Sequence, residues 1–243
     1  MTIRQLEQGS LSLRAYAMLR EALVAGSFAP GERLVMQDLA ARLGTSVTPV
    51  REACLRLVSE RGLELRGGRA FIVPALDLDR YMEVRMIRTV LEGIATELAA
   101  TRATPADVRR LADIQARFEH ARLTGDNEAA ITGNRDFHFG VYCLSGKNLL
   151  LHQIEMMWIS MGPILRVYHQ EVVTDYVGAQ EHVHIIEALA RGDGPAARAA
   201  LERDVMRGGE GIVRHLTALQ DSQVNAVSEP SYVSHARARS WDE

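Results

Sequence analysis

The feature that most constrains the fold is the long stretch from Asp77 to about Leu216, where apolar residues recur at helical spacing and no alternating strand pattern appears. Helix signals recur along it. The segment TPADV, for example, offers Thr104 as a cap, followed by proline at the first helical position. A stretch this long and free of strands predicts an antiparallel bundle of about six helices. We therefore expect residues 75–218 to form one all-α domain.

Residues 1–74 follow a different pattern. Helical stretches near residues 12–25 and 36–43 are separated by glycine and proline, and a third helix begins after Thr45 or Ser46, either of which can cap it. The segment LELRGGRAFIVP then predicts two short strands around a tight turn at two glycines. Two helices, a turn, a third helix and a hairpin form the winged helix-turn-helix pattern.

Composition adds three expectations. Residues 1–74 contain ten arginines and seven acidic residues, a balance of +3, whereas the whole chain carries −3, which fits a first domain that meets a polyanion. No segment approaches the roughly 20 apolar residues of a membrane span, and the N-terminus lacks the apolar run of a signal peptide, so we expect a cytoplasmic protein that binds no membrane. Residues 219–243 are polar and aperiodic, and we expect a disordered tail there.

Metal-competent side chains stand inside the predicted helices. Asn134 and His138, in NRDFH, are four residues apart and so share one helical face, and EHVH places His182 and His184 on a later helix. From spacing alone, these side chains are either a ligand set or ordinary buried polar groups whose hydrogen bonds are satisfied.

The front half resembles the DNA-binding domain of the GntR family of bacterial transcription regulators. The PGERL turn, the LAARLG helix and the TPVREA recognition helix stand in the family's order and spacing. The resemblance implies a homodimeric regulator, usually a repressor, whose recognition helices enter the major groove of a double-stranded DNA operator. The candidate DNA-binding residues are Gln37, Thr45, Ser46, Val47, Thr48, Arg51, Gly68 and Arg69.

Physical chemistry gives these residues distinct roles. The hydroxyl groups at the start of the recognition helix suit phosphate, and Arg51 can reach guanine or phosphate. Gly68 allows the wing to approach the minor groove, where Arg69 supplies charge. Gln37 is included because the resemblance places a DNA contact there. Val47 departs from relatives that carry arginine, and it can at most touch a thymine methyl group.

The back half resembles the ligand-binding FCD domain of the FadR subfamily. The resemblance rests on RTVLEG, NRDFHF, SGKNLLL and EHVHIIEALARGDGPAARAAL. Such domains often hold a divalent metal between helices, and carrying the ligand positions over gives Asn134, His138, His182 and Asp204. Asp204 stands where a third histidine is usual. Two imidazoles and two oxygen donors favour zinc, nickel, manganese or iron over calcium.

The same resemblance places an inward arginine at Arg88, where it would face an anionic effector. Arg85 lies three residues earlier, and Arg166 is a third candidate. Guanidinium groups bind carboxylates through a bidentate fork, so we expect a small carboxylate effector such as a sugar acid or hydroxy acid. The segment from Phe71 to Asp79 is the covalent link between the halves and the expected point of coupling.

Three alternatives stay open. A metal-free cavity could bind an organic acid directly, and the bundle could be a dimerisation module without ligand. A metalloenzyme is the third, since two histidines and a carboxylate can activate water. We do not expect an enzyme, because no general base with suitable spacing appears and a DNA-binding pattern precedes the bundle.

Overall fold

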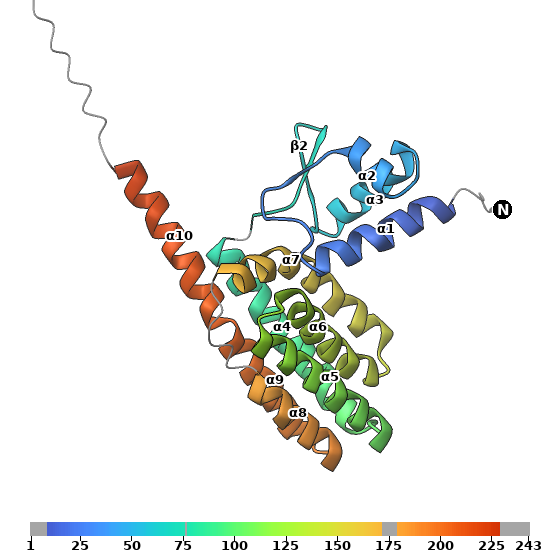
Figure 1. Cartoon of the computed structure of the whole chain (residues 1–243), viewed down its shortest axis with the longest axis vertical. Coiled ribbons are helices and arrows are strands. Elements are labelled where there is room, and N and C mark those ends of the chain that lie inside the picture. The colour runs from blue at the N-terminus through green and yellow to red at the C-terminus, as the bar shows by residue number, and fades with distance from the viewer. Residues whose placement is uncertain (1–8, 76, 172–178, 229–243) are drawn as a thin grey trace, which may run out of the picture.

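The computed structural model describes residues 9–75, 77–171 and 179–228, with side chains described for residues 11–75, 77–165 and 179–222. The elements of the first domain are α1 (Gly9–Val24), β1 (Arg33–Leu34), α2 (Met36–Arg42), α3 (Val47–Ser59), β2 (Glu64–Arg66) and β3 (Ala70–Ile72). The domain is the predicted winged helix-turn-helix. Figure 1 shows it at one end of a helical bundle.

The wing is a three-stranded antiparallel sheet in the order β1-β3-β2. The predicted hairpin is confirmed, and Gly67 and Gly68 both adopt positive φ in its turn (56° and 68°), a conformation that glycine reaches without strain. Strand β1 was not predicted. It places Leu34 opposite Phe71, and two residues are too few to show an alternating pattern in a sequence.

The second domain is all helical, as predicted. Its helices are α4 (Leu78–Ala100), α5 (Pro105–Thr124), α6 (Asn127–Leu144), α7 (Asn148–Glu171), α8 (Ala179–Arg191), α9 (Gly194–Gly208) and α10 (Glu210–Ser228). Helix α4 lies at the centre of the bundle, in contact with α6, α7 and α9. None of the described helices is long and apolar enough to cross a membrane.

Local sequence explains several helix ends. Asp77 caps α4 by accepting the backbone N–H of Arg80 at 2.8 Å. Thr104 and Asp107 form a reciprocal capping box at the start of α5, and α5 ends at Gly125 in the left-handed conformation. These signals explain why the helix boundaries in this part of the bundle follow the sequence closely.

The C-terminal end of the bundle differs from the sequence prediction. Residues 192–216, which the sequence predicted as one helix, divide into α9 and α10 at Gly209. Helix α10 continues to Ser228, so the expectation of a disordered tail is wrong for residues 219–228, while residues 229–243 lie outside the described part. Residues 217–222 are exposed, because this part of α10 extends past the bundle (Figure 1).

The two domains share a packed contact besides their covalent link. Helix α1 lies against α7 (Figure 1), and Ile159 of α7 is 1% exposed within the apolar core of the winged domain. Gly62 makes room for it, since a Cβ at Gly62 would lie 2.5 Å from the Ile159 side chain. A Cβ at Gly162 would overlap the carbonyl oxygen of Leu23, so only glycine allows α7 to approach the end of α1 this closely.

Candidate functional site

The start of α3 presents an exposed polar surface. Ser46, Val47 and Thr48 are exposed there, and Arg51 follows one turn later, also exposed. Ser46 occupies the N-cap position as predicted, but its side chain makes no capping hydrogen bond. The opposite face of α3 is buried in the domain core, so the helix can present this end without losing its packing.

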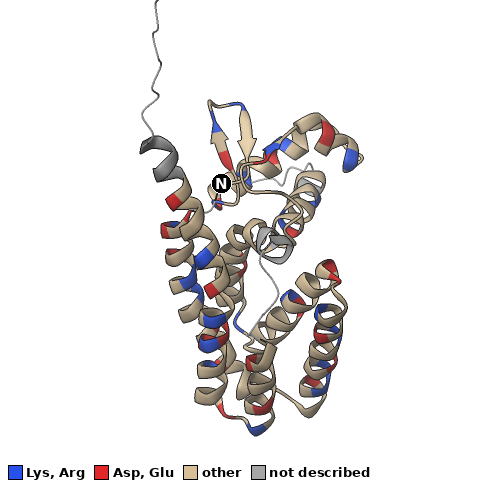
Figure 2. Cartoon of the chain, turned by 60° about the vertical axis from the view of Figure 1, so that its left-hand side comes forward, with Lys and Arg blue, Asp and Glu red and all other residues tan. Residues whose placement is uncertain are grey.

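The neighbouring residues complete this surface. Gln37 is exposed near the start of α2, and Thr45 is partly exposed just before α3. The guanidinium of Arg51 lies 5.6 Å from the ring centre of Phe71, a core residue of β3 that anchors the wing. Gly68 and Arg69 are exposed at the wing tip. In Figure 2, blue segments mark basic residues on the hairpin and on the helices of the winged domain.

A second cluster of functional side chains is buried in the helical domain. His138 of α6, His182 of α8 and Asp204 of α9 are all at most 3% exposed. The Nε2 atoms of the two histidines are 3.3 Å apart, and the Asp204 carboxylate lies 3.3 Å from His138 Nε2 and 3.8 Å from His182 Nε2. Three separate helices therefore bring three metal-competent groups to one point. Asn134 is partly buried, and it lines the small cavity beside them.

These separations fit a metal ion. A zinc-like ion binds nitrogen and oxygen at about 2.0–2.2 Å, so two of its ligand atoms lie about 3.0–3.6 Å apart at ordinary coordination angles. Two of the three measured separations fall in that range, and the third is slightly longer. The ligand atoms need to move only slightly to hold an ion.

In each histidine, Nδ1 is the outer nitrogen, which faces away from the cluster. It also has a hydrogen-bond partner. His138 Nδ1 lies 3.1 Å from the Tyr142 hydroxyl, and that hydroxyl donates its proton to Glu92 at 2.6 Å. The Tyr142 oxygen therefore accepts from His138, which places the imidazole proton on Nδ1. His182 Nδ1 lies 2.7 Å from the Gln115 side-chain oxygen, an acceptor, so its proton is on Nδ1 as well. Each Nε2 then carries a lone pair directed at the same point, which is the arrangement that a cation requires.

Burial keeps the His182 imidazole and the Tyr142 phenol neutral. Burial is the main cause that lowers the pKa of His182 to about 3, and nearby His138 lowers it further, against the opposing effect of Asp204. Burial, reinforced by Glu92, raises the pKa of Tyr142 well above its usual value. At neutral pH, His182 is thus an unprotonated imidazole and Tyr142 an intact phenol.

Glu92 is the centre of a buried hydrogen-bond network beside the cluster. Its carboxylate is fully buried and accepts from Arg88 (2.7 and 3.2 Å), from Tyr142, and from the indole nitrogen of Trp158 at 2.8 Å. Burial alone would lower the pKa of Arg88, but Glu92 outweighs it and holds that pKa above its usual value. The positive charge of Arg88 is therefore already balanced inside the protein.

The network and the cluster share one small cavity of about 40 Å³. Its wall contains Arg88, Asn134, His138 and Asp204, so these four predicted residues do come together. Further wall residues come from α7 (Trp158, Met161 and Leu165) and from the start of α10 (Ile212). This volume is far below the roughly 300–1,000 Å³ of an ordinary small-molecule pocket, so a sugar acid does not fit without movement of a wall.

The other two predicted arginines have different outcomes. Arg85 is not among the described residues that line this cavity, and its guanidinium lies 5.9 Å from the ring centre of Tyr81 instead. The side chain of Arg166 lies outside the described part of the structure. Arg88 does line the cavity, but its fork faces Glu92 rather than open space.

Sequence reasoning missed the outer partners of the metal-competent residues. Glu92 follows Arg88 by four residues, and Tyr142 follows His138 by four, so helical spacing alone could have linked both pairs. Gln115 had no such signal, because it reaches His182 from α5, 67 positions away in the sequence.

Comparison with known proteins agrees with these two structural halves. Residues 11–73 match the model of the bacterial regulatory proteins of the gntR family, and residues 83–207 match the FCD domain. The HTH-type transcriptional regulator McbR of Escherichia coli K12 is 37% identical over 163 residues, which are 67% of this chain and 74% of that protein. A probable D-xylose utilization operon transcriptional repressor of Paenarthrobacter nicotinovorans is 31% identical over 171 residues, covering 69% of this chain and 74% of that protein.

A solved structure supports the same assignment. The structure of E. coli McbR/YncC superposes with a TM-score of 0.75 at 32% identity, covering 89% of this chain and 99% of that chain. These relatives are transcription regulators, which confirms the prediction of a DNA-binding regulator and makes the metalloenzyme alternative wrong. The chain belongs to the GntR family of bacterial regulatory proteins, among the members that carry an FCD domain.

Proposed function

We propose that this protein is a cytoplasmic, homodimeric repressor whose affinity for its operator is set by a small carboxylate bound beside a divalent metal in the helical domain. The observation that carries the proposal is the convergence of His138, His182 and Asp204, with a hydrogen-bonding oxygen beside Nδ1 of each histidine. The small cavity beside these groups is the place where a ligand would meet the metal.

Four residues would hold the metal: His138, His182 and Asp204 directly, and Asn134 from the cavity wall. Two imidazole nitrogens with oxygen donors suit zinc, nickel, manganese or iron. Such an ion would supply a Lewis-acidic position for a carboxylate oxygen. Because Glu92 already engages the fork of Arg88, a ligand that recruits this arginine has to share it with Glu92.

The small cavity gives a physical reason for coupling between the ligand and DNA. A carboxylate such as a sugar acid is too large for this cavity and has to displace a wall, and Trp158 of α7 is one of the wall residues. The next residue, Ile159, faces a different side of α7 and is buried in the core of the winged domain, whereas Trp158 belongs to the core of the bundle. Displacement of this turn of α7 would therefore disturb the packing in the cores of both domains. This effect would add to any effect through the covalent link at residues 71–79. A ligand shifts the DNA-binding equilibrium only if it binds the two arrangements with different affinity.

The DNA-binding side of the proposal rests on the exposed start of α3 and the wing. Two copies would place two recognition helices on the half-sites of a palindrome. Phosphate contacts would make the affinity fall steeply with salt. The relative from Paenarthrobacter is named as a probable operon repressor, and this supports the same sign of regulation here.

The metal can be tested directly. We expect the purified protein to contain close to one divalent ion per chain, measured by elemental analysis, and we expect His138→Ala and His182→Ala to lose it. His184→Ala is the matched control, because His184 lies on the same helix but is 43% exposed by its side chain and pairs with Glu181. Metal content that is zero in the native protein, or equal in all three variants, would support a metal-free cavity or a dimerisation module instead.

A further inference from the structure

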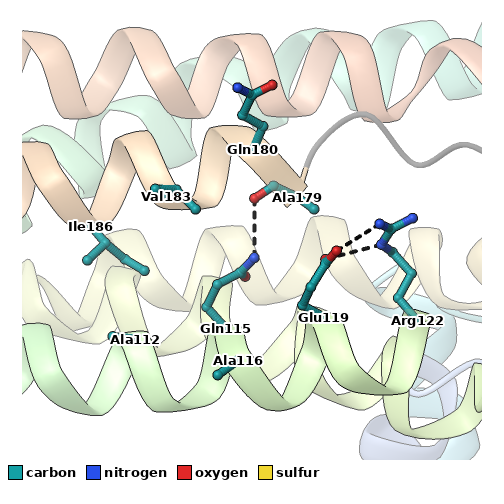
Figure 3. A pocket seen from close by; sticks show the side chains of 9 residues that line it. All are labelled: Ala112, Gln115, Ala116, Glu119, Arg122, Ala179, Gln180, Val183 and Ile186. Carbon is teal, nitrogen blue, oxygen red and sulfur yellow. Dashed lines mark hydrogen bonds and ion pairs between the residues drawn. The ribbon is translucent and has the colours of Figure 1, made fainter. Parts of the chain in front are cut away.

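Gln115 of α5 places its side-chain oxygen 2.7 Å from Nδ1 of His182, the ring nitrogen that faces away from the metal-competent cluster. The nitrogen of the same amide donates to the backbone carbonyl of Ala179, at the start of α8, at 3.2 Å. Figure 3 shows this second contact across the groove between α5 and α8. Gln115 as a whole is 8% exposed.

The two contacts fix the orientation of the amide. The end that faces the Ala179 carbonyl must be the NH₂ group, because a carbonyl can only accept a hydrogen bond. The end that faces His182 is then the oxygen, which accepts the imidazole proton from Nδ1. The Nε2 lone pair of His182 is left for the interior, where it points towards His138 and Asp204.

The plane of the His182 ring is fixed by other groups. Phe137 stacks on the ring with centroids 4.1 Å apart and an angle of 19° between the planes, and Phe118 packs nearby at 5.4 Å. Apolar packing of this kind holds a ring in place but does not distinguish its two nitrogens. The choice of nitrogen requires a polar partner, and Gln115 supplies it.

We propose that Gln115 is a positioning residue, which sets the tautomer of His182 so that Nε2 is available to a metal. This inference rests on the proposed metal site and names a residue on which its affinity depends. Tyr142 and Glu92 do the same for His138, through a phenol backed by a carboxylate. His182 is held by a neutral amide instead, so the two ligands differ in the polarity of their outer partners.

Three variants test the inference through Zn²⁺ affinity, measured by competition with a chromophoric chelator. Gln115→Met keeps an unbranched side chain of similar length but removes the acceptor, and we expect affinity to fall about 10–100-fold, the usual effect of losing an outer partner. Gln115→Glu keeps an acceptor and should recover most of that affinity, while its carboxylate faces the Ala179 carbonyl and lowers thermal stability. Gln180→Met is the matched control, since Gln180 lines the same groove but is exposed.

A second readout keeps the inference testable if Gln115→Met folds poorly. Imidazole ¹⁵N shifts of the native, metal-stripped protein should show His182 protonated on Nδ1, and those of Gln115→Met should show a mixture of tautomers. Native affinity in Gln115→Met, or a native His182 protonated on Nε2, would overturn the inference. If His138→Ala and His182→Ala leave metal content unchanged, the proposed function fails instead, and the tautomer measurement still decides the role of Gln115.

Discussion

The two functional surfaces of this protein are built in opposite ways. The proposed DNA contacts at the start of α3 and on the wing are exposed residues, and the core of the winged domain packs beneath them without their contribution. The metal-competent cluster is buried, and its members come from separate helices. One of them, His138, is linked to the buried Glu92 through the Tyr142 hydroxyl. Changes to the first surface should therefore alter binding alone, whereas changes to the second should alter stability and binding together.

Glu92 offers the strongest test of this difference. Glu92→Gln keeps the size of the side chain but leaves the buried charge of Arg88 uncompensated, so we expect the free energy of unfolding to fall by about 3–5 kcal/mol. Glu97→Gln is the control on the same helix. Glu97 is 40% exposed by its side chain and pairs with Arg198, so its loss should cost no more than about 1 kcal/mol. If urea unfolding shows an equal loss of stability for Glu92→Gln and Glu97→Gln, the buried network does not differ from the exposed surface in this respect.

The contact between α1 and α7 tests whether the helical domain also holds the winged domain in position. Gly162→Ala places a methyl group against the Leu23 carbonyl, and overpacking of this kind typically costs about 1–3 kcal/mol. We expect separation of α1 from α7, seen in calorimetry as two unfolding transitions in place of one. Gln153→Ala, at an exposed position of α7, serves as the control. A single unchanged transition for Gly162→Ala would show that α7 does not join the domains.

Arg51 tests the exposed surface, where a substitution should weaken DNA binding without lowering stability. Arg51→Ala should weaken binding to a selected operator duplex by about 10–100-fold, which corresponds to about 1–3 kcal/mol for a base contact. Its unfolding free energy should stay within about 0.5 kcal/mol of the native value, because the side chain is exposed. Arg110→Ala removes the same charge from an exposed position on α5 and should leave binding unchanged. Equal weakening by both variants would indicate a general charge effect rather than a contact.

The wing should give the smallest effect. Arg69→Ala should weaken binding to all duplexes similarly and reduce the slope of log affinity against log salt by about 1, as expected for one lost phosphate contact. The slope is measured by fluorescence anisotropy between low and moderate salt. An unchanged slope combined with altered sequence preference would reassign Arg69 to base recognition.

The sequence predicted the exposed surface better than the buried one for a physical reason. Gly67 and Gly68 mark the hairpin because the turn needs positive φ, and the start of α3 follows from a local pattern. The convergence of His138, His182 and Asp204 depends on packing between distant helices, which spacing cannot reveal, and the resemblance to a known domain was needed to propose it. Arg88 was predicted to face an anionic effector. In the structure it forms an ion pair with Glu92, which lies on the same helical face.

The measurement that tests the central claim most directly is the operator affinity of the metal-loaded native protein across a panel of small carboxylates, with His138→Ala measured in parallel. We expect at least one carboxylate to change the affinity of the native protein by about 5–150-fold, the usual range for coupled sites, and to leave that of His138→Ala unchanged. If no carboxylate changes the native affinity, or if both proteins respond equally, the buried site does not control DNA binding.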